Sequence, residues 1–234
     1  MKKWGFKVLI GVLFVTLAFG GAAMAQTTKQ AKEPAKAAAK KAMDTAIIVV
    51  DLQGDFTKAK KGSLAVEGTD EAYVKAVADA TAKLKAAGFP IYATQDWHPA
   101  THASFAVNHQ GKKPFDVIKL HGKDQVLWPP HCVQNTPGAE ILLDKKLFKA
   151  VVRKGMDAQF DSYSGFQDDG GKKTEMDKIL KKAGIKKVVV YGIATDYCVK
   201  ATAEDAAAPP PPPKEEKKSS GGGIGNFLRD FLGN

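Results

Sequence analysis

Short apolar runs that alternate with amphipathic helical patterns constrain the fold of this chain more than any other feature. Four runs rich in Val, Ile and Ala lie at residues 46–50, 91–94, 150–153 and 188–193. Residues 70–87 repeat apolar side chains at three- and four-residue steps, and Gly88 follows as a stop signal. A second helix is expected at 176–183. Strands alternating with helices predict an α/β protein of three layers, in which helices cover both faces of a parallel sheet.

The ends of the predicted strands supply a carboxylate, an ammonium group and a thiol. Asp51 follows the first strand, Lys154 follows the third, and Cys198 comes shortly after the fourth. In parallel α/β sheets the chemistry collects at the carboxyl ends of the strands. A thiol with an unperturbed pKa of about 8.5 is mostly protonated at neutral pH, so a nucleophilic cysteine needs a base or a cation nearby. Taken singly, such an aspartate caps a helix and such a lysine is solvated. Their joint placement favours a cysteine nucleophile.

A possible metal site lies after the second strand. Asp96 and His98 are two residues apart, which places both side chains on one face of an extended chain. His131 follows two prolines that restrict the backbone, and it is a third candidate ligand. His102 is a possible fourth. An isolated Asp-x-His pair is more often a surface aspartate and a half-buried histidine, so the prediction depends on the whole set. A carboxylate with two imidazoles suits zinc, iron(II) or manganese.

The N-terminal segment has the three-part pattern of a secretory signal peptide. Residues 1–25 contain three lysines, an apolar run at 8–19, and Ala-Met-Ala at 23–25. The alternative is an uncleaved membrane anchor, but the apolar run is shorter than the roughly 20 residues that span a bilayer. We therefore predict an exported protein, periplasmic or secreted, that begins at Gln26 after cleavage. Residues 26–45 are rich in Lys and Ala and are predicted to form a linker.

Only two cysteines are present, Cys132 and Cys198. An exported protein normally meets an oxidising compartment, where paired cysteines tend to form disulfides. A disulfide between these two residues is therefore the alternative to a catalytic role for Cys198.

The net charge of +10 does not point to a nucleic-acid partner. The chain has 35 basic and 25 acidic residues, but residues 46–205 carry 23 basic against 20 acidic side chains. A nucleic-acid-binding domain would concentrate Lys and Arg on its folded part. Most of the excess lies near the two ends instead, so we expect no nucleic-acid binding.

Six short strings, in this order along the chain, together resemble the nicotinamidase/pyrazinamidase group of the isochorismatase-like cysteine hydrolases. They are DLQGDF at 51–56, TQDWHP at 94–99, WPPHC at 128–132, RKG at 153–155, YSGF at 163–166 and GIATDYC at 192–198. The resemblance covers about residues 45–206. It implies the isochorismatase-like hydrolase fold, which is a three-layer α/β/α arrangement.

The resemblance also implies roles for individual residues. Asp51, Lys154 and Cys198 would form the catalytic triad, and the backbone N–H groups of Ala194 and Cys198 would form the oxyanion hole. The metal ligands would be Asp96, His98 and His131, and some relatives use a histidine at the position of His102 as an extra ligand. Phe56, Trp128 and Tyr163 would contact the ring of the substrate. The peptide bond between Ile193 and Ala194 would be cis.

The implied activity is the hydrolysis of nicotinamide, or of pyrazinamide-like amides, to the carboxylate and ammonia through a thioester. This reaction belongs to NAD salvage. One divalent ion is implied, with zinc as the first expectation and iron or manganese as alternatives. Two other functions stay open: another small-amide or carbamoyl hydrolase of the same fold, and a catalytically silent exported binding protein. A homo-oligomer is compatible with either.

The C-terminal part departs from the family. Relatives continue after the helix that carries the cysteine with another strand and a closing helix, whereas this chain runs into five prolines at 209–213. We therefore expect a domain at 46–208 that lacks the last strand and helix and has an open sheet edge. Residues 209–223 are predicted to be a linker. Residues 224–234 place apolar side chains at helical spacing, which suits either a tail that contacts a membrane or a partner, or a frayed end.

Overall fold

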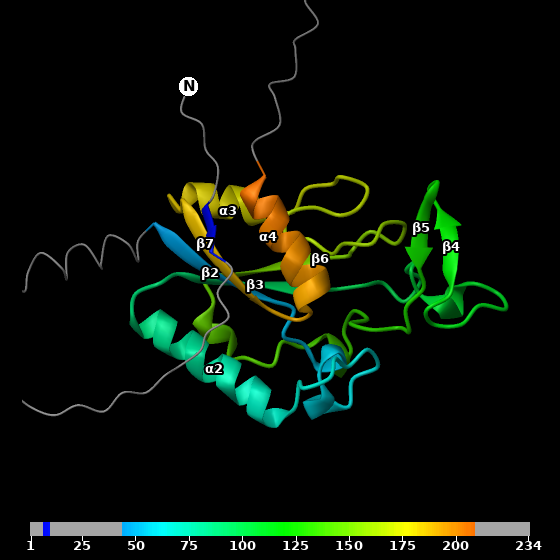
Figure 1. Cartoon of the computed structure of the whole chain (residues 1–234), viewed down its shortest axis with the longest axis horizontal. Helices are drawn as coiled ribbons and strands as arrows, with labels where there is room; N and C mark the ends of the chain where they lie inside the picture. Colours follow the sequence, from blue (N-terminus) through cyan, green and yellow to red (C-terminus); the bar gives the residue numbers. More distant parts are fainter. Residues whose placement is uncertain (1–6, 10–43, 209–234) are drawn as a thin grey trace, which may run out of the picture.

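The computed structural model describes residues 7–9 and 44–208. Its centre is a five-stranded sheet with the order β1-β7-β2-β3-β6, in which every neighbouring pair is parallel (Figure 1). The strands are β1 (Lys7–Leu9), β2 (Thr45–Val50), β3 (Ile91–Asp96), β6 (Ala150–Lys154) and β7 (Lys187–Gly192). The predicted parallel sheet is confirmed. The predicted linkers and tail lie outside the described residues, except for 44 and 45, and so does the predicted signal peptide, except for β1.

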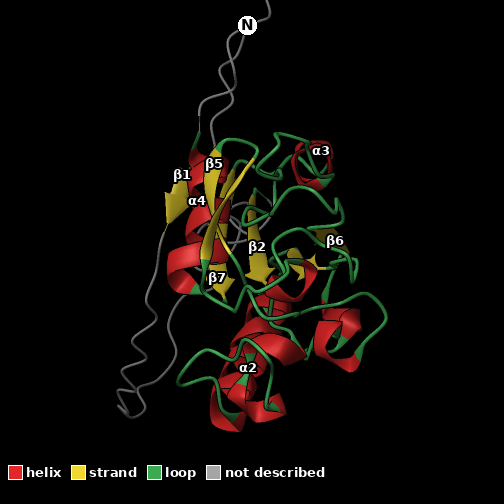
Figure 2. Ribbon diagram, turned by 90° about the vertical axis from the view of Figure 1, so that its right-hand side faces the viewer, coloured by secondary structure: helices red, strands yellow, loops and turns green. Residues whose placement is uncertain are grey.

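Helices cover both faces of the sheet. Helix α2 (Glu71–Ala86) lies on one face, and helices α3 (Met176–Lys182) and α4 (Lys200–Ala207) lie on the other (Figures 1 and 2). Asp70 is the N-cap of α2, and its side chain accepts a hydrogen bond from the backbone N–H of Tyr73 at 2.9 Å. Gly88 follows the helix with a φ of +89°, a conformation that glycine adopts without strain. The predicted helices at 70–87 and 176–183 are confirmed. No helix among the described residues combines the length and the apolar composition needed to cross a bilayer.

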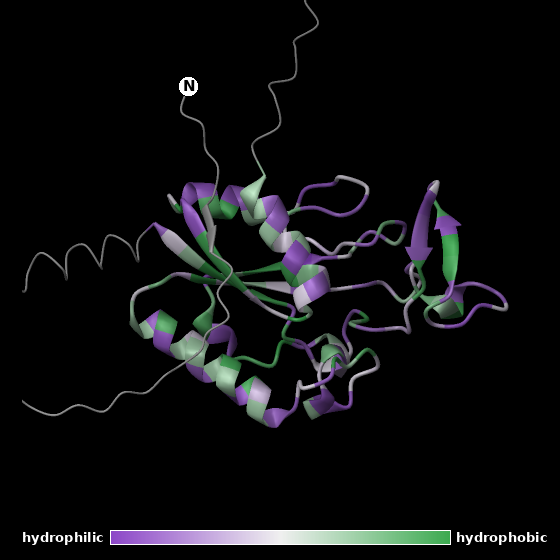
Figure 3. Ribbon diagram, in the orientation of Figure 1, coloured by the Kyte–Doolittle hydropathy of each residue, from purple (hydrophilic) through white to green (hydrophobic). Residues whose placement is uncertain are grey.

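The core explains why the central strand is a continuous apolar run. Every residue of β2 is buried. Ala46, Ile48 and Val50 pack with the side chains of α3 and α4, whereas Ile47 and Val49 pack on the side of α2. Successive side chains of a strand point to opposite faces, so a strand buried on both faces must be apolar at every position. Figure 3 shows the same pattern as hydrophobic strands between helices with alternating hydropathy.

Shorter elements lie in the segments that connect the strands and helices. They are five 3₁₀ turns at 54–56, 58–60, 106–108, 137–139 and 145–147, and a π-helical turn at Thr195–Val199. An antiparallel hairpin, made of β4 (Val117–Leu120) and β5 (Lys123–Val126), projects from the sheet (Figure 1).

The outer edge of β7 corrects one expectation. The sequence predicted that β7 would form an open edge, because no strand-like segment follows the helix that carries the cysteine. In the structure β1 pairs with β7 in parallel, with Lys7 opposite Lys187 and Leu9 opposite Val189. Three residues of the predicted signal peptide therefore occupy the edge, where the backbone groups of β7 would otherwise have no strand partner.

Candidate active site

The carboxyl ends of three adjacent strands bring a lysine and two aspartates together around a cysteine. The side chain of Lys154, at the end of β6, is fully buried. Its Nζ lies 3.0 Å from Oδ2 of Asp51, which follows β2, and 2.6 Å from Oδ1 of Asp96, the last residue of β3. The same nitrogen also lies 3.5 Å from Sγ of Cys198 and donates to the backbone carbonyl of Ser162 at 2.6 Å. The predicted joint placement of Asp51, Lys154 and Cys198 is therefore what the structure contains.

Cys198 is positioned by the π-helical turn that follows β7. The turn is closed by the backbone N–H of Val199, which donates to the carbonyl of Ala194 at 3.1 Å. The Ile193–Ala194 peptide bond is cis, as the family resemblance implies. An oxygen of Asp51, an oxygen of Asp96 and Sγ of Cys198 all lie within 4.8 Å of one another. The thiol is thus within reach of a carboxylate base.

The two cysteines are not bonded to each other. Both are free and buried. Cys198 packs with the cluster on the side of α3 and α4, whereas Cys132 packs with the cluster on the side of α2. The disulfide alternative is therefore absent from this structure, and the thiol of Cys198 is available for chemistry.

Burial and the local charges set the protonation states at rest. Burial raises the pKa of Asp51 to about 6, although Lys154 acts in the opposite direction. Burial also raises the pKa of the Cys198 thiol well above its usual range, again against the effect of Lys154. Burial alone would lower the pKa of Lys154, but Asp51 and Asp96 outweigh it and raise that pKa. The resting site therefore holds a protonated thiol beside a cationic lysine, and attack needs a base.

Asp51 is oriented to be that base. Thr94 donates its hydroxyl to Oδ1 of Asp51 at 2.7 Å. Oδ2 lies in an ion pair with Lys154, yet among the described residues it has no partner in hydrogen-bond geometry. This oxygen is therefore open to the thiol proton.

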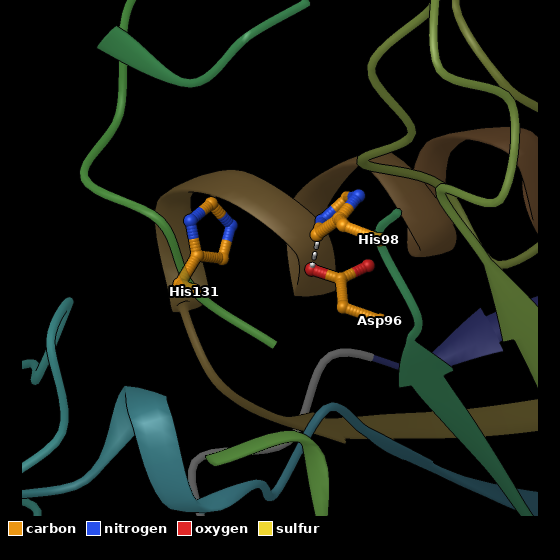
Figure 4. Close-up of side chains that lie close together, drawn as sticks. All are labelled: Asp96, His98 and His131. Carbon is orange, nitrogen blue, oxygen red and sulfur yellow. Dashed lines mark ion pairs between the residues drawn. The ribbon is translucent and has the colours of Figure 1, made fainter. Parts of the chain in front are cut away.

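Asp96, His98 and His131 form a second group beside the triad. One ligand atom of each lies within 4.8 Å of the other two (Figure 4). Nε2 of His98 lies 3.5 Å from Oδ2 of Asp96. The Nδ1 atoms of His98 and His131 lie 2.9 Å and 2.8 Å from the backbone carbonyls of Gly155 and Pro129, so both Nδ1 atoms are donors and Nε2 is the atom of each ring that can bind an ion.

This group fits a divalent metal ion. Nε2 of His98 is buried and has no hydrogen-bond partner among residues 44–208, which is unusual for a buried ring nitrogen. A carboxylate and two imidazole nitrogens that converge in this way are a common donor set for divalent metals. Gly155 allows the close packing around the site, because a Cβ there would collide with the ring of His98.

His102 lies next to this group but is engaged elsewhere. The backbone N–H of Ser104 donates to Nδ1 of His102 at 3.2 Å, so Nδ1 is the acceptor and Nε2 carries the proton. Nε2 then donates to the carbonyl of Phe160 at 3.1 Å. Its ring centroid is 4.5 Å from that of His98. A role for His102 as a fourth ligand stays a prediction, and with these two bonds in place neither ring nitrogen is free to bind an ion.

The thiol and the metal group open into one cavity of about 270 Å³. Cys198, Ala194, Asp96 and His131 line its reactive side. The predicted ring-binding residues all line it as well, namely Phe56, Trp128 and Tyr163. The cavity thus combines aromatic side chains with a thiol and two residues of the metal group, which suits the hydrolysis of an aromatic amide.

Several supporting residues were missed by the sequence reasoning. Gln53 accepts from the backbone N–H of Asp96 at 2.7 Å and donates to its carbonyl at 2.9 Å, so it holds the backbone of a metal-group residue. Thr94 orients Asp51, and Tyr197 lines the cavity. Asp161 lines it too. Gln53, Thr94 and Tyr197 lie inside the six strings, which was the available signal, whereas Asp161 lies just before one of them.

Comparisons with known proteins agree with this geometry. The family model described as the isochorismatase domain matches residues 45–209. A nicotinamidase from Acinetobacter baylyi is 45% identical over 170 residues, which cover 71% of this chain and 76% of that protein. A yeast nicotinamidase bound to the inhibitor nicotinaldehyde has a TM-score of 0.63 and 35% identity, covering 69% of this chain and 81% of that one. A pyrazinamidase of Pyrococcus horikoshii in complex with zinc has a TM-score of 0.55 and 39% identity. The match covers 70% of this chain and 78% of that chain.

Proposed function

Because the chain belongs to the isochorismatase family, we propose that it is a metal-containing cysteine amidase that hydrolyses nicotinamide, and pyrazinamide-like amides, to the carboxylate and ammonia. One observation carries this proposal: Cys198, Asp96, His131 and an aromatic wall share a single cavity. The relatives named nicotinamidase, at 37–45% identity, support the choice of substrate.

The first half of the reaction forms a thioester. Asp51 accepts the proton of the Cys198 thiol, and the thiolate attacks the carboxamide carbon of the substrate. Lys154 stays cationic and stabilises the negative charge that Asp51 and the thiolate share. The carbonyl oxygen becomes an oxyanion that accepts hydrogen bonds from the backbone N–H groups of Ala194 and Cys198. Each such donor contributes on the order of 3 kcal/mol. Asp51 then returns the proton to the amide nitrogen, the C–N bond breaks, and ammonia leaves, which completes the thioester.

The second half regenerates the enzyme. Water then attacks the thioester carbon while Asp51 accepts one of its protons. The C–S bond breaks, and the proton on Asp51 returns to the sulfur of Cys198. The acid product gives its remaining proton to the solvent and leaves as the carboxylate.

The metal ion would be held by the carboxylate of Asp96 and by Nε2 of His98 and of His131. When bound, it would hold the pyridine nitrogen of the substrate and order nearby water. We propose zinc as this ion, supported by the donor set and by the relative that is described in complex with zinc. Iron(II) and manganese suit the same donors.

The signal-peptide pattern of residues 1–25 supports a further part of the proposal, that the protein is exported. N-terminal sequencing of the chain recovered from the periplasm or medium tests it. A new N-terminus at Gln26 in that fraction supports export, and a full-length chain confined to the cytoplasm contradicts it.

The decisive experiment measures ammonia release from nicotinamide by the purified full chain, with metal content determined on the same sample. Release with about one metal per chain is the expected result. A metal-loaded chain that hydrolyses only ureido or carbamoyl amides would favour the carbamoyl-hydrolase alternative. A folded chain that releases no ammonia from any of these amides would favour the binding-protein alternative.

A further inference from the structure

Asp161 is a buried carboxylate in the cavity to which the reaction above assigns no role. It lies in the loop between β6 and α3, and 6% of it is exposed. Its Oδ2 accepts from Nε1 of Trp128 and from Nε2 of Gln125, each at 3.2 Å. Its Oδ1 accepts from the backbone N–H of Ser162 at 3.1 Å. All three partners are donors, which is what an ionised carboxylate requires.

No Lys or Arg pairs with Asp161 among the described residues. Burial alone would raise the pKa of its carboxyl, but the imidazolium forms of His98, His102 and His131, present at the acidic pH where a carboxyl titrates, outweigh that effect and lower the pKa. The carboxylate is therefore charged at neutral pH. A charged acceptor makes stronger hydrogen bonds than a neutral one, and its donors are held correspondingly firmly.

The indole of Trp128 depends on this acceptor for its orientation. Trp128 lines the cavity with 8% of its surface exposed, and Nε1 is its one polar side-chain atom. It also contacts two rings edge-on, those of Phe115 and Tyr197, at centroid distances of 6.1 Å and 5.6 Å. Ring contacts tolerate rotation of the indole plane, whereas the bond to Asp161 defines one orientation.

The same carboxylate also connects the cavity to the projecting hairpin. Gln125 belongs to β5, so its bond ties the hairpin to the atom that holds Trp128. A second link joins the same segments, because His121 stacks on Phe160 at a centroid distance of 4.4 Å and its Nε2 donates to the carbonyl of Gln159 at 3.0 Å. The hairpin is therefore attached at two places to the segment 159–161, which carries Asp161.

We propose that Asp161 is a positioning residue that holds the Trp128 indole as a preformed wall of the substrate cavity and anchors the β4–β5 hairpin to that wall. This inference rests on the proposed amidase function, and it assigns Asp161 to binding of the aromatic ring. Asp161 touches neither the thiol nor the carboxamide in this account, so its loss affects ground-state binding and leaves the chemical step unchanged.

The test compares Asp161→Asn, Trp128→Phe and the double variant in the full chain. Asparagine keeps the shape of the side chain but removes its charge. We expect Asp161→Asn to raise KM for nicotinamide about tenfold while kcat stays within about twofold. In the Trp128→Phe background the indole donor is gone, so adding Asp161→Asn should change KM little. The matched control is Asp169→Asn, which removes a charge from the same loop without a bond to Trp128, and it should leave KM unchanged.

Two further readouts separate this role from others. Trp128 emission, obtained by subtracting the Trp128→Phe spectrum, should shift to longer wavelength in Asp161→Asn, because the indole becomes mobile and more hydrated. Metal content should stay at the wild-type level. Loss of metal, a fall in kcat at constant KM, or equal effects of Asp161→Asn in both backgrounds would each overturn the proposal. If the wild-type chain does not hydrolyse nicotinamide, the emission shift still decides whether Asp161 positions Trp128, and an unshifted spectrum refutes it.

Discussion

At the scale of single residues, Lys154 links the two halves of the site. Its ammonium group contacts Asp51 of the triad, Asp96 of the metal group and the thiol of Cys198. Two buried carboxylates around one buried cation are tolerable only while the cation is present. The joint placement of these residues was predictable from the sequence, because each of them lies at or shortly after the end of a predicted strand.

Replacing Lys154 by Met removes this charge and keeps most of the side-chain volume. Asp51 and Asp96 then lie buried without a cation, so we expect the free energy of unfolding to fall by about 3–5 kcal/mol and turnover to disappear. Urea denaturation at neutral pH measures the first effect. Lys172→Met is the control, because Lys172 is exposed, and its stability should change by less than about 0.5 kcal/mol. Equal stability of the two variants would contradict the account.

Removing the thiol should separate chemistry from metal binding. Cys198→Ala is expected to abolish ammonia release, because no other thiol lines the cavity among the described residues, while metal content stays at the wild-type level. Cys132→Ala is the control, because it removes a buried thiol that lies in the opposite cluster, and it should retain turnover. Turnover by Cys198→Ala would exclude the covalent route.

The raised pKa of Asp51 predicts the pH dependence of the reaction. Asp51 accepts the thiol proton only when it is ionised, and burial raises its pKa to about 6. Activity should therefore be high above this value and fall as the pH drops through it. The measurement is kcat/KM for nicotinamide from about pH 4.5 to 8, with intrinsic fluorescence as a check on folding. A flat profile across this range would mean that Asp51 is not the base.

At the scale of elements, strand β1 is the feature that local sequence patterns assigned differently. The sequence pattern assigns residues 7–9 to a signal peptide. In the structure they pair with β7, the strand that leads into Ala194 and Cys198. Helix α2 shows the opposite case, because its apolar spacing, its capping Asp70 and its stop at Gly88 are all local signals, and the structure agrees with them.

A chain that begins at Gln26 lacks β1, so its β7 loses a strand partner. We expect this chain to be less stable than the full chain by about 1–3 kcal/mol, from a few lost backbone hydrogen bonds offset by the ordering they require. Thermal unfolding of both chains, with ammonia release, measures the effect. In the full chain the double substitution Lys7→Pro/Val8→Pro should reproduce it and Val8→Ile should not, because one of two neighbouring strand residues donates its N–H to the partner strand and proline has none. Identical melting of all four proteins would show that β1 contributes nothing to stability.

At the scale of the whole molecule, metal binding and folding are linked. The metal group is assembled from two distant segments of the chain, so the unfolded chain does not contain the site. An ion at 100 times its Kd adds about 2.7 kcal/mol to the stability of the folded state. For a domain of this size that corresponds to a rise in Tm of about 5–10 °C.

Chelation should therefore lower Tm by about that amount and abolish ammonia release, and added zinc should restore both. Differential scanning calorimetry with and without chelator measures the shift. His131→Ala serves as the control, because a chain without this ligand should melt at the same temperature in both conditions. A chelator-independent Tm in the wild-type chain would argue against a resident metal.

The sequence by itself determined the layered fold and most of the site. Periodicities of two and of about 3.6 residues are set by neighbours along the chain, so strands and helices can be predicted locally. The ends of parallel strands converge in any such sheet, and this is why Asp51, Lys154 and Cys198 could be predicted to meet. The family resemblance added the metal ligands and the aromatic wall.

Only the tertiary structure decided the contacts that depend on how loops return to the sheet. The bond between Asp161 and Trp128, the placement of Cys132 and Cys198 in different core clusters, and the pairing of β1 with β7 have no local pattern. The two bonds of His102 reach Ser104 and Phe160, and the second partner lies 58 residues away. Such contacts form because buried polar groups and open strand edges must find partners within the folded chain, and the path of the chain selects which partner is near.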